Sequence, residues 1–252
     1  MKTVGARERR WPVLDGLRGI AIVMMLLSNF IYDLTMFGCK LDPHTGFLAW
    51  FSRATAAAFL LVAGIALTLS YHRLPPGAPR FPKYLRRGLR LLALALVVTL
   101  ATWVAVGKGL VLFGILHLLG VSIILAAPLL PYKYPNLLAG LAVIGIGLWL
   151  NRLLAPSPWL LPLGVRYSGF YSVDYTPIFP WFGLLLLGIF LGHLCCPAGS
   201  PPPAPPRLLA TPGGRLLSYL GRNSLRIYFI HQPLFLGLLW GWRVLAKFLA
   251  QG

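Results

Sequence analysis

The sequence predicts an all-α fold, a single polytopic membrane bundle of about seven transmembrane helices. Three observations predict it: 58% of the 252 residues are hydrophobic, only 11% are charged, and the hydrophobic residues gather in long runs. An ordinary soluble domain carries about 25% charged residues. This chain lacks the polar surface that would cover a water-soluble core, which excludes soluble enzymes, disulfide-rich secreted proteins and disordered chains.

Each predicted helix is an apolar run close to the ~20 residues that a hydrocarbon core ~30 Å thick requires. The seven runs occupy most of the chain, and the remainder is too short for an extramembrane domain, so we expect residues 1–252 to form one transmembrane domain. The predicted spans lie near 11–32, 47–71, 88–107, 110–130, 135–154, 178–195 and 224–246.

Two connecting segments differ in composition from the others. Residues 155–177 are rich in Pro and aromatic residues, and we expect them either to lie along the membrane interface or to fold back over the bundle. Residues 197–213 are rich in Pro and Gly, which is typical of a flexible linker.

The distribution of Lys and Arg predicts the orientation, because cytoplasmic loops carry an excess of these residues. With a cytosolic N-terminus, fourteen of them fall in inner loops and six in outer loops. The N-terminus is therefore predicted to be cytosolic and the C-terminus to lie outside. We interpret the net charge of +18 as loops that face anionic lipid, and we predict no nucleic-acid partner.

The first span contains polar side chains, which are costly inside a bilayer and usually face a bundle interior or a cavity. Asp15, Arg18 and Asn29 share one face of this helix by their spacing. Asp15 and Arg18 can pair near the inner end, whereas Asn29 lies about 16 Å beyond Arg18 and near the outer end. These groups are either structural, as an ion pair and an interhelical hydrogen bond, or parts of a functional site.

Further polar residues are predicted near the outer face. His44 lies in the loop before the second span, and Arg53 lies in the outer third of that span. His117 lies in the outer half of the fourth span and Asp174 at the outer mouth of the sixth. With Asn29, these groups come from five segments that can converge. The histidines have no Cys or Glu at metal-ligand spacing, so we predict no metal site.

A group of arginines is predicted at the inner ends of two helices. They either anchor lipid phosphates or hold a soluble polyphosphate ligand through bidentate guanidinium contacts. His231 lies deeper in the last span, where Pro233 frees a backbone carbonyl, a common device beside membrane cavities. The arginines are Arg86, Arg87 and Arg90 at the third span, and Arg222 and Arg226 at the seventh.

Five strings run through most of the chain: LDGLRGIAIVMMLLSNF (14–30), FLLVAGIALTLS (59–70), FGILHLLGVS (113–122), VDYTPIFPWFGLLLLGIFLG (173–192) and GRNSLRIYFIHQPL (221–234). Together and in this order they resemble the bacterial and archaeal relatives of heparan-α-glucosaminide N-acetyltransferase, in the transmembrane acyltransferase superfamily. The last string resembles a motif that other membrane acyltransferases share.

The resemblance implies an enzyme that moves an acetyl group from cytosolic acetyl-CoA to an amine on the opposite side of the membrane. In the family, a histidine in the first outer loop acts with an asparagine late in the first span, and by type and position these match His44 and Asn29. Asp15 and Arg18-Gly19 match the start of that span. The implied setting is a prokaryotic cell membrane, with the lipid bilayer, acetyl-CoA and an amine-bearing saccharide as partners; a homodimer is compatible with the sequence.

Elementary chemistry suits these roles. When a thioester acylates an amine, a neutral imidazole near pH 7 can take the amine proton, or can itself accept the acetyl group covalently. An Asn amide can donate to the developing oxyanion or orient the imidazole. The covalent route and direct transfer are both consistent with the sequence. The predicted donor-binding residues are Arg18, Arg86, Arg87, Arg90, Arg222, Arg226 and His231.

Our sequence-based prediction is therefore a membrane N-acetyltransferase that uses acetyl-CoA. The alternative is a small-solute or proton-coupled transporter that uses the same buried groups, namely Asp15, Arg18, His117 and His231. A seven-helix binding or structural protein is a second alternative. Turnover of acetyl-CoA separates the enzyme from both, since neither a transporter nor a binding protein hydrolyses or transfers the acetyl group.

Overall fold

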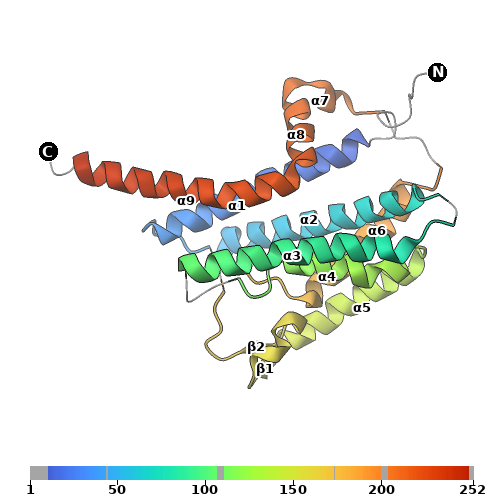
Figure 1. Cartoon of the computed structure of the whole chain (residues 1–252), viewed down its shortest axis with the longest axis horizontal. Helices are drawn as coiled ribbons and strands as arrows, with labels where there is room; N and C mark the ends of the chain where they lie inside the picture. The colour runs from blue at the N-terminus through green and yellow to red at the C-terminus, as the bar shows by residue number, and fades with distance from the viewer. Residues whose placement is uncertain are drawn as a thin grey trace. The chain divides into compact units, whose positions relative to one another are not determined.

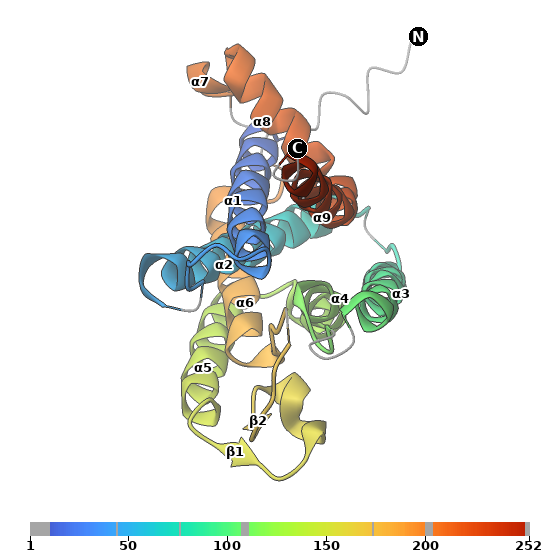
Figure 2. The same ribbon diagram turned by 90° about the vertical axis from the view of Figure 1, so that its left-hand side faces the viewer.

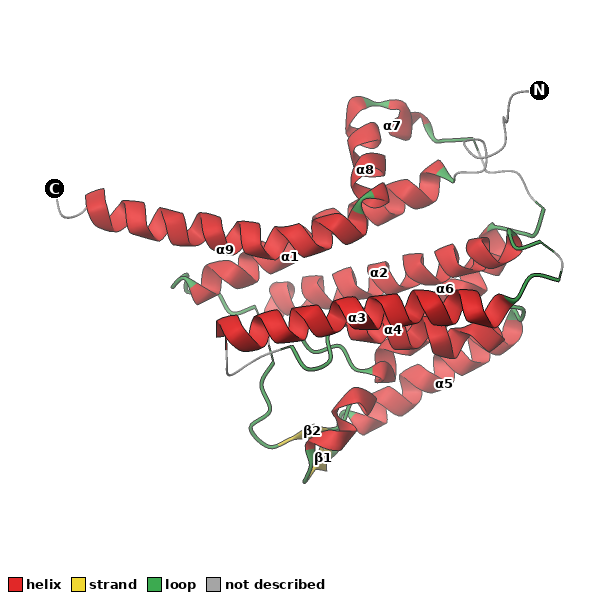
Figure 3. Cartoon of the chain, in the orientation of Figure 1, coloured by secondary structure: helices red, strands yellow, loops and turns green. Residues whose placement is uncertain are grey.

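The fold is almost entirely helical, as predicted, and the strands that the structure describes are confined to one short pair (Figure 3). The structure is a computed structural model. It describes residues 11–43, 45–75, 77–106, 111–172, 174–199 and 204–249.

The long helices coincide with the apolar runs of the sequence. In chain order, the elements are α1 (Pro12–Met36), α2 (Gly46–His72), α3 (Arg80–Val106), α4 (Ile115–Ala126), the 3-10 turn η1 (Ala127–Leu129), α5 (Tyr134–Leu150), β1 (Leu154–Ala155), the 3-10 turn η2 (Pro158–Leu163), β2 (Arg166–Tyr167), α6 (Ile178–Cys195), α7 (Arg207–Ala210), α8 (Pro212–Arg222) and α9 (Ser224–Leu249).

The largest difference from the predicted spans is at the start of α3. This helix begins at Arg80 rather than near residue 88, so Arg86, Arg87 and Arg90 lie inside it. Apolar periodicity marks only the part of a helix that meets hydrocarbon, whereas Arg and Lys, which are good helix formers, extend it into the headgroup region. α6, in contrast, has the predicted bounds of 178–195.

Among the described residues, four helices are long and apolar enough to cross a membrane: α1, α2, α3 over Arg80–Val104, and α6. Two shorter apolar helices follow α3, over Ile115–Leu129 and Tyr134–Leu150. α9 has 26 residues but is interrupted by basic side chains such as Arg226 and Arg243. The chain is therefore a multi-pass membrane protein, while the count of seven spans and the cytosolic N-terminus stay predictions.

The chain forms two compact units, and the boundary between them falls inside α2. One unit is residues 60–200, in which α5 lies antiparallel to α6 and α3 antiparallel to α4 (Figures 1 and 2). The end of α2 packs on α6, where the Thr68 hydroxyl donates to the Ile189 carbonyl over 3.1 Å. The side chains of Leu67 and Leu185 are fully buried in the core of this unit.

In the unit of residues 60–200, the loop between α5 and α6 folds back onto the start of α4. The Thr176 N–H donates to the Phe113 carbonyl over 2.8 Å, and the Tyr175 hydroxyl donates to the Leu161 carbonyl over 2.8 Å. The bond to Phe113 favours the fold-back alternative for this Pro-rich segment, and the bond between Tyr175 and Leu161 holds the loop to itself.

The other unit combines residues 1–59 with 201–252, so it brings the two ends of the chain together. In this unit α1 packs against both α8 and α9 (Figure 1). α1 and α8 approach so closely that a Cβ at Gly221 would overlap the Asp15 carbonyl oxygen. The absence of a side chain at this glycine therefore permits the crossing.

The prediction of a flexible linker over residues 197–213 is wrong for its last part. α7 begins at Arg207, and α8 begins at Pro212. The Thr211 hydroxyl accepts the Gly214 N–H over 3.2 Å and so caps α8. The composition of this stretch is that of a loop, but Thr followed by Pro is also a signal that starts a helix.

Candidate functional site

The polar face of α1 meets α9 through a hydrogen bond between Asn29 and His231. Asn29 Nδ2 lies 2.8 Å from His231 Nε2, and the two helices lie side by side (Figure 1). His231 is only 5% exposed. Phe235 packs edge-to-face on the His231 ring with centroids 5.7 Å apart, and Phe30 packs on Phe235 at 5.2 Å. The asparagine of the first span thus has its partner near the other end of the sequence.

The backbone of α9 determines which nitrogen of His231 carries the proton. His231 Nδ1 lies 2.7 Å from the Tyr228 carbonyl oxygen, and a carbonyl can only accept, so Nδ1–H donates to it. In the neutral ring Nε2 is then the acceptor, and it accepts an N–H of the Asn29 amide. This bond fixes the orientation of the amide, which has one further N–H and a carbonyl oxygen to offer.

A second bond between the same helices joins Asp33 to Gln232. Gln232 Nε2 donates to Asp33 Oδ1 over 2.7 Å. Asp33 lies one helical turn beyond Asn29 on α1, and Gln232 follows His231 on α9. The sequence analysis did not single out this pair, although the spacing of Asn29 and Asp33 at i and i+4 was a usable signal.

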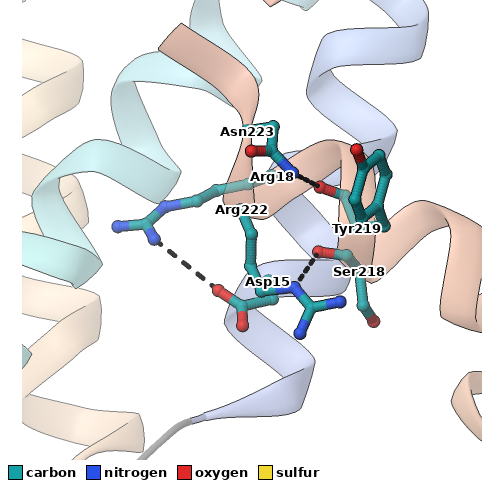
Figure 4. Close-up of polar contacts among 6 residues, drawn as sticks. All are labelled: Asp15, Arg18, Ser218, Tyr219, Arg222 and Asn223. Carbon is teal, nitrogen blue, oxygen red and sulfur yellow. Dashed lines mark hydrogen bonds and ion pairs between the residues drawn. The ribbon is translucent and has the colours of Figure 1, made fainter. Parts of the chain in front are cut away.

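A cluster of charged side chains lies near the start of α1, where α8 crosses it (Figure 4). Asp15 Oδ1 lies 3.7 Å from Arg18 Nη1, which confirms the predicted pair. Arg222 is in the last turn of α8, and its Nε donates to the Ser218 carbonyl over 3.2 Å. Gly221 brings this turn onto the backbone of Asp15. The crossing therefore gathers Asp15, Arg18 and Arg222 from the two ends of the chain.

Asp174, in the unit of residues 60–200, anchors the start of α4. Its Oδ2 accepts the Ile115 N–H over 3.1 Å and its Oδ1 accepts the Thr176 hydroxyl over 2.9 Å. Burial raises the pKa of the Asp174 carboxyl above its usual value, although both hydrogen bonds oppose the rise. The bonds of Asp174 are those of a group that holds a helix end in place.

His117 lies on the first turn of α4 and is buried, with both ring nitrogens engaged. Its Nδ1 accepts the Gly114 N–H over 3.3 Å, so in the neutral ring Nε2–H points to the Thr99 hydroxyl at 3.4 Å. The Thr99 hydroxyl donates in turn to the Val111 carbonyl over 2.6 Å. This chain of bonds favours the structural interpretation of His117.

We expect Asp174→Ala to lower the free energy of unfolding by about 1–3 kcal/mol, because it leaves the partly buried Ile115 N–H and the Thr176 hydroxyl without this acceptor. Thermal unfolding of the purified protein in detergent measures the loss. Asp42→Ala, which removes an exposed acid, is the matched control. A variant that keeps its stability and loses acetyl transfer would instead assign Asp174 to the chemistry.

The remaining predicted residues are divided between the two units. Arg53 is exposed on α2 in the unit that contains the chain ends, and His44 lies outside the described residues. Apart from Arg18, which is partly buried, the predicted donor-binding arginines are exposed: Arg86, Arg87 and Arg90 on α3 in one unit, and Arg222 and Arg226 on α8 and α9 in the other.

One polar cluster was not predicted from the sequence, at the ends of α2 and α6. The rings of His72 and His193 lie with centroids 5.0 Å apart. His72 donates through Nδ1 to the Cys196 carbonyl over 2.8 Å, and His193 donates through Nε2 to the Leu130 carbonyl over 2.9 Å. These bonds tie helix ends together. In the described ranges, no three His, Cys, Asp or Glu side chains gather as a metal site would require.

One of the comparisons with known proteins found a match. The sequence matches the family model described as heparan-alpha-glucosaminide N-acetyltransferase, catalytic, over residues 10–233. This range covers most of the chain and includes both Asn29 and His231. No curated protein and no solved structure matches the sequence.

Proposed function

Because the chain belongs to the heparan-alpha-glucosaminide N-acetyltransferase catalytic family and is a membrane enzyme of the N-acetyltransferase type, we propose that it moves acetyl groups across the membrane. The proposed donor is cytosolic acetyl-CoA, and the proposed acceptor is an amine, such as that of an amino sugar, on the outer side. The proposed location is the cell membrane of a prokaryote.

The observation that carries the proposal is the partly buried hydrogen bond between Asn29 and His231. It joins the end of the first family-like string (14–30) to the end of the last one (221–234), so these two strings meet in space. Because Nε2 of His231 holds one Asn29 N–H, the amide is oriented in advance, as an oxyanion donor must be. We propose that its second N–H stabilises the oxygen of the acetyl group during transfer.

The proposed proton acceptor or acetyl carrier is His44, which lies outside the described residues. As a neutral imidazole it would either take the amine proton while the amine attacks the thioester, or form an acetyl-imidazole that the amine then attacks. His231 is proposed to position Asn29 at the acetyl end of the donor. This role is more specific than the donor binding predicted for His231 from the sequence, and it is supported by the bonds of His231 to Asn29 and the α9 backbone.

The proposed site for the CoA phosphates is the cluster of charged side chains where α1 crosses α8. Arg18 and Arg222 lie there, and guanidinium groups suit bidentate phosphate contacts. Asn29 lies eleven residues beyond Arg18 on the same helix, about 16 Å along its axis. An extended donor could therefore place its anionic end at the crossing and its acetyl end at Asn29. For Arg86, Arg87, Arg90 and Arg226, contact with the CoA phosphates stays a prediction from the sequence, with lipid anchoring as the alternative.

Proteoliposomes test the proposed function directly. Glucosamine is trapped inside the vesicles, radiolabelled acetyl-CoA is added outside, and vesicles without protein are the control. We expect labelled N-acetylglucosamine to accumulate inside while free CoA appears outside. A solute transporter would instead move label without releasing CoA thiol, and that result would overturn the enzyme proposal.

We expect Arg222→Ala to weaken CoA binding by about 1.5–3 kcal/mol, the contribution of a charge-assisted hydrogen bond. Isothermal titration of CoA into the detergent-solubilised protein measures the change. Arg215→Ala is the matched control, since it removes an exposed arginine from the same helix, whose Nε donates to the Ala210 carbonyl.

The same titration extends to the other predicted donor-binding arginines, which are Arg18, Arg86, Arg87, Arg90 and Arg226. If these residues only anchor lipid, each single replacement by Ala leaves the affinity for CoA unchanged. Unchanged affinity in all six variants would assign the arginines to lipid and contradict the donor site.

A further inference from the structure

Asp33 is a buried acid whose second carboxylate oxygen has no partner. The described residues contain four acids. Asp15 pairs with Arg18, Asp42 is exposed, and Asp174 accepts two hydrogen bonds. Asp33, in contrast, is 0% exposed, and its Oδ2 lacks any hydrogen-bond partner. Buried polar atoms are nearly always paired, so an orphaned oxygen of this kind points to a partner that arrives with the substrate.

The other oxygen of Asp33 is held firmly. Gln232 donates to Oδ1 over 2.7 Å, and this bond runs beside the one between Asn29 and His231 at 2.8 Å. The two bonds join residues one turn apart on α1 to consecutive residues on α9. The Asp33 carboxylate is thus held between α1 and α9, as is the Asn29 amide. The proposed function assigns that amide to the acetyl group.

We propose that Asp33 binds the ammonium group of the acceptor through Oδ2 and takes a proton from it, an assignment that rests on the proposed acetyl transfer. The ligand class is a primary amine that is cationic near neutral pH. A carboxylate oxygen is an acceptor only, and an ammonium group brings both the donors and the opposite charge that a buried carboxylate needs.

The spacing on α1 suits the reaction. One helical turn separates Asn29 from Asp33 by about 6 Å along the axis. An amine nitrogen within hydrogen-bond reach of Asp33, at about 3 Å, and an acetyl carbon about 3–3.5 Å from that nitrogen together span this length. The acetyl carbon would then lie beside the Asn29 amide.

The proposed step is balanced in atoms and charge. The ammonium group gives one proton to the Asp33 carboxylate and becomes a neutral amine. Its lone pair attacks the acetyl carbon, a new N–C bond forms, and the bond from the acetyl carbon to the CoA sulfur, or to the imidazole of an acetylated histidine, breaks. In direct transfer, the proposed imidazole base takes the second amine proton and passes it to the departing thiolate; in the covalent route, the departing imidazole takes it. The products are the N-acetyl amine, protonated Asp33, and either CoA thiol or the free imidazole; Asp33 then releases its proton to water.

Asp33 also explains how a strongly basic chain can accept a cationic substrate. The sequence has 23 Lys and Arg against 5 Asp and Glu, so its general field attracts the anionic donor and repels an ammonium group. A buried carboxylate provides a local negative charge where the acceptor must bind. A hydroxyl acceptor would leave that carboxylate without a counter-charge, and we expect the site to discriminate against it.

The test compares Asp33→Asn with wild type on two acceptors. One is glucosamine, which is cationic at pH 7, and the other is an aminooxy sugar, whose nitrogen is neutral at that pH. The asparagine keeps the shape and can still accept the Gln232 N–H. We expect kcat/KM for glucosamine to fall by about 10²-fold or more, as for loss of a general base. Transfer to the aminooxy sugar should be nearly unchanged, and activity on glucosamine should return as the pH rises through the pKa of the amine.

Two control variants separate this role from a structural one. Gln232→Met removes the same hydrogen bond from the α9 side and keeps the carboxylate, so the preference for the cationic acceptor should persist. Asp42→Asn removes an exposed negative charge from the loop after α1 and should also keep the preference. Equal losses on both acceptors in Asp33→Asn, or no loss on either, would overturn the assignment.

A binding measurement keeps the inference distinct from the proposed function. Glucosamine at millimolar concentration should raise the Tm of the wild-type protein and leave the Tm of Asp33→Asn unchanged, whereas glucose should raise neither. If the wild type transfers acetyl to no amine and still shows this pattern, the ammonium site stands and the transferase proposal fails. If glucosamine raises both values of Tm equally, or neither, the ammonium site is overturned.

Discussion

His44→Ala is expected to lower the rate of acetyl transfer by about 10²-fold or more and to leave CoA affinity and folding nearly intact. The loss follows from the role proposed for this imidazole, which is to accept the amine proton or to carry the acetyl group. The sequence predicts His44 in the loop before the second span, and replacement of a loop side chain is expected to cost little stability. The affinity for CoA should not change, because His44 is not among the proposed phosphate contacts.

Single-turnover transfer from radiolabelled acetyl-CoA to glucosamine measures this effect. His117→Ala is the matched control, because its ring nitrogens are engaged with the Gly114 N–H and the Thr99 hydroxyl at the start of α4. That variant should lose stability and keep its rate when it is assayed at a temperature where it is folded. Full activity in His44→Ala, together with loss of activity in folded His117→Ala, would move the base to α4. Acid-labile label retained on wild type and absent from His44→Ala would favour the covalent route.

Asn29→Ala is expected to lower the rate of transfer by about 10²–10³-fold, the effect of losing one oxyanion donor. His231 holds the Asn29 amide through Nε2, so His231→Ala should lower the rate through the loss of this orientation. When two residues act together, the effects of replacing them do not add. The double variant should therefore be no slower than Asn29→Ala alone. The measurement is the same single-turnover assay on the two single variants and the double variant.

Phe235→Leu is the control for the packing of α1 against α9. It removes the edge-to-face contacts with Phe30 and His231 and leaves the hydrogen bond between Asn29 and His231 in place. Its stability should fall and its rate should change little. If the losses in rate of the two single variants add up in the double variant, Asn29 and His231 act independently. That result would contradict the proposed role of His231 in orienting Asn29.

The all-helical class and most helix positions were predictable from the sequence because hydrophobicity is a local property. The bounds of α6 and the starts of α1, α2 and α9 follow directly from where apolar residues begin and end. The predictions failed where polar residues form helix. α3 extends back to Arg80, and α7 and α8 form in and after a segment whose Pro and Gly suggested a linker. In those places capping and tertiary contacts decide the structure, and neither produces an apolar run.

The candidate site was only partly predictable. The spacing within α1 was enough to pair Asp15 with Arg18 and to place Asn29 on the same face, because neighbours on one helix are set by its 3.6-residue period. Proximity between His117 and Asp174 was also expected. Their bonds, however, are to the backbone and to hydroxyl groups at the start of α4, and this could not be known before the partners were located.

The sequence by itself determined that the chain is a helical membrane protein, and its strings carried the resemblance to a family of acetyltransferases. Only the tertiary structure showed that His231 orients Asn29, that Gln232 holds Asp33, and that α8 brings Arg222 to Asp15 and Arg18. The first kind of information is local and periodic, so it can be found in any short window of the chain. The second kind joins residues about 200 positions apart, and it depends on which helices pack together.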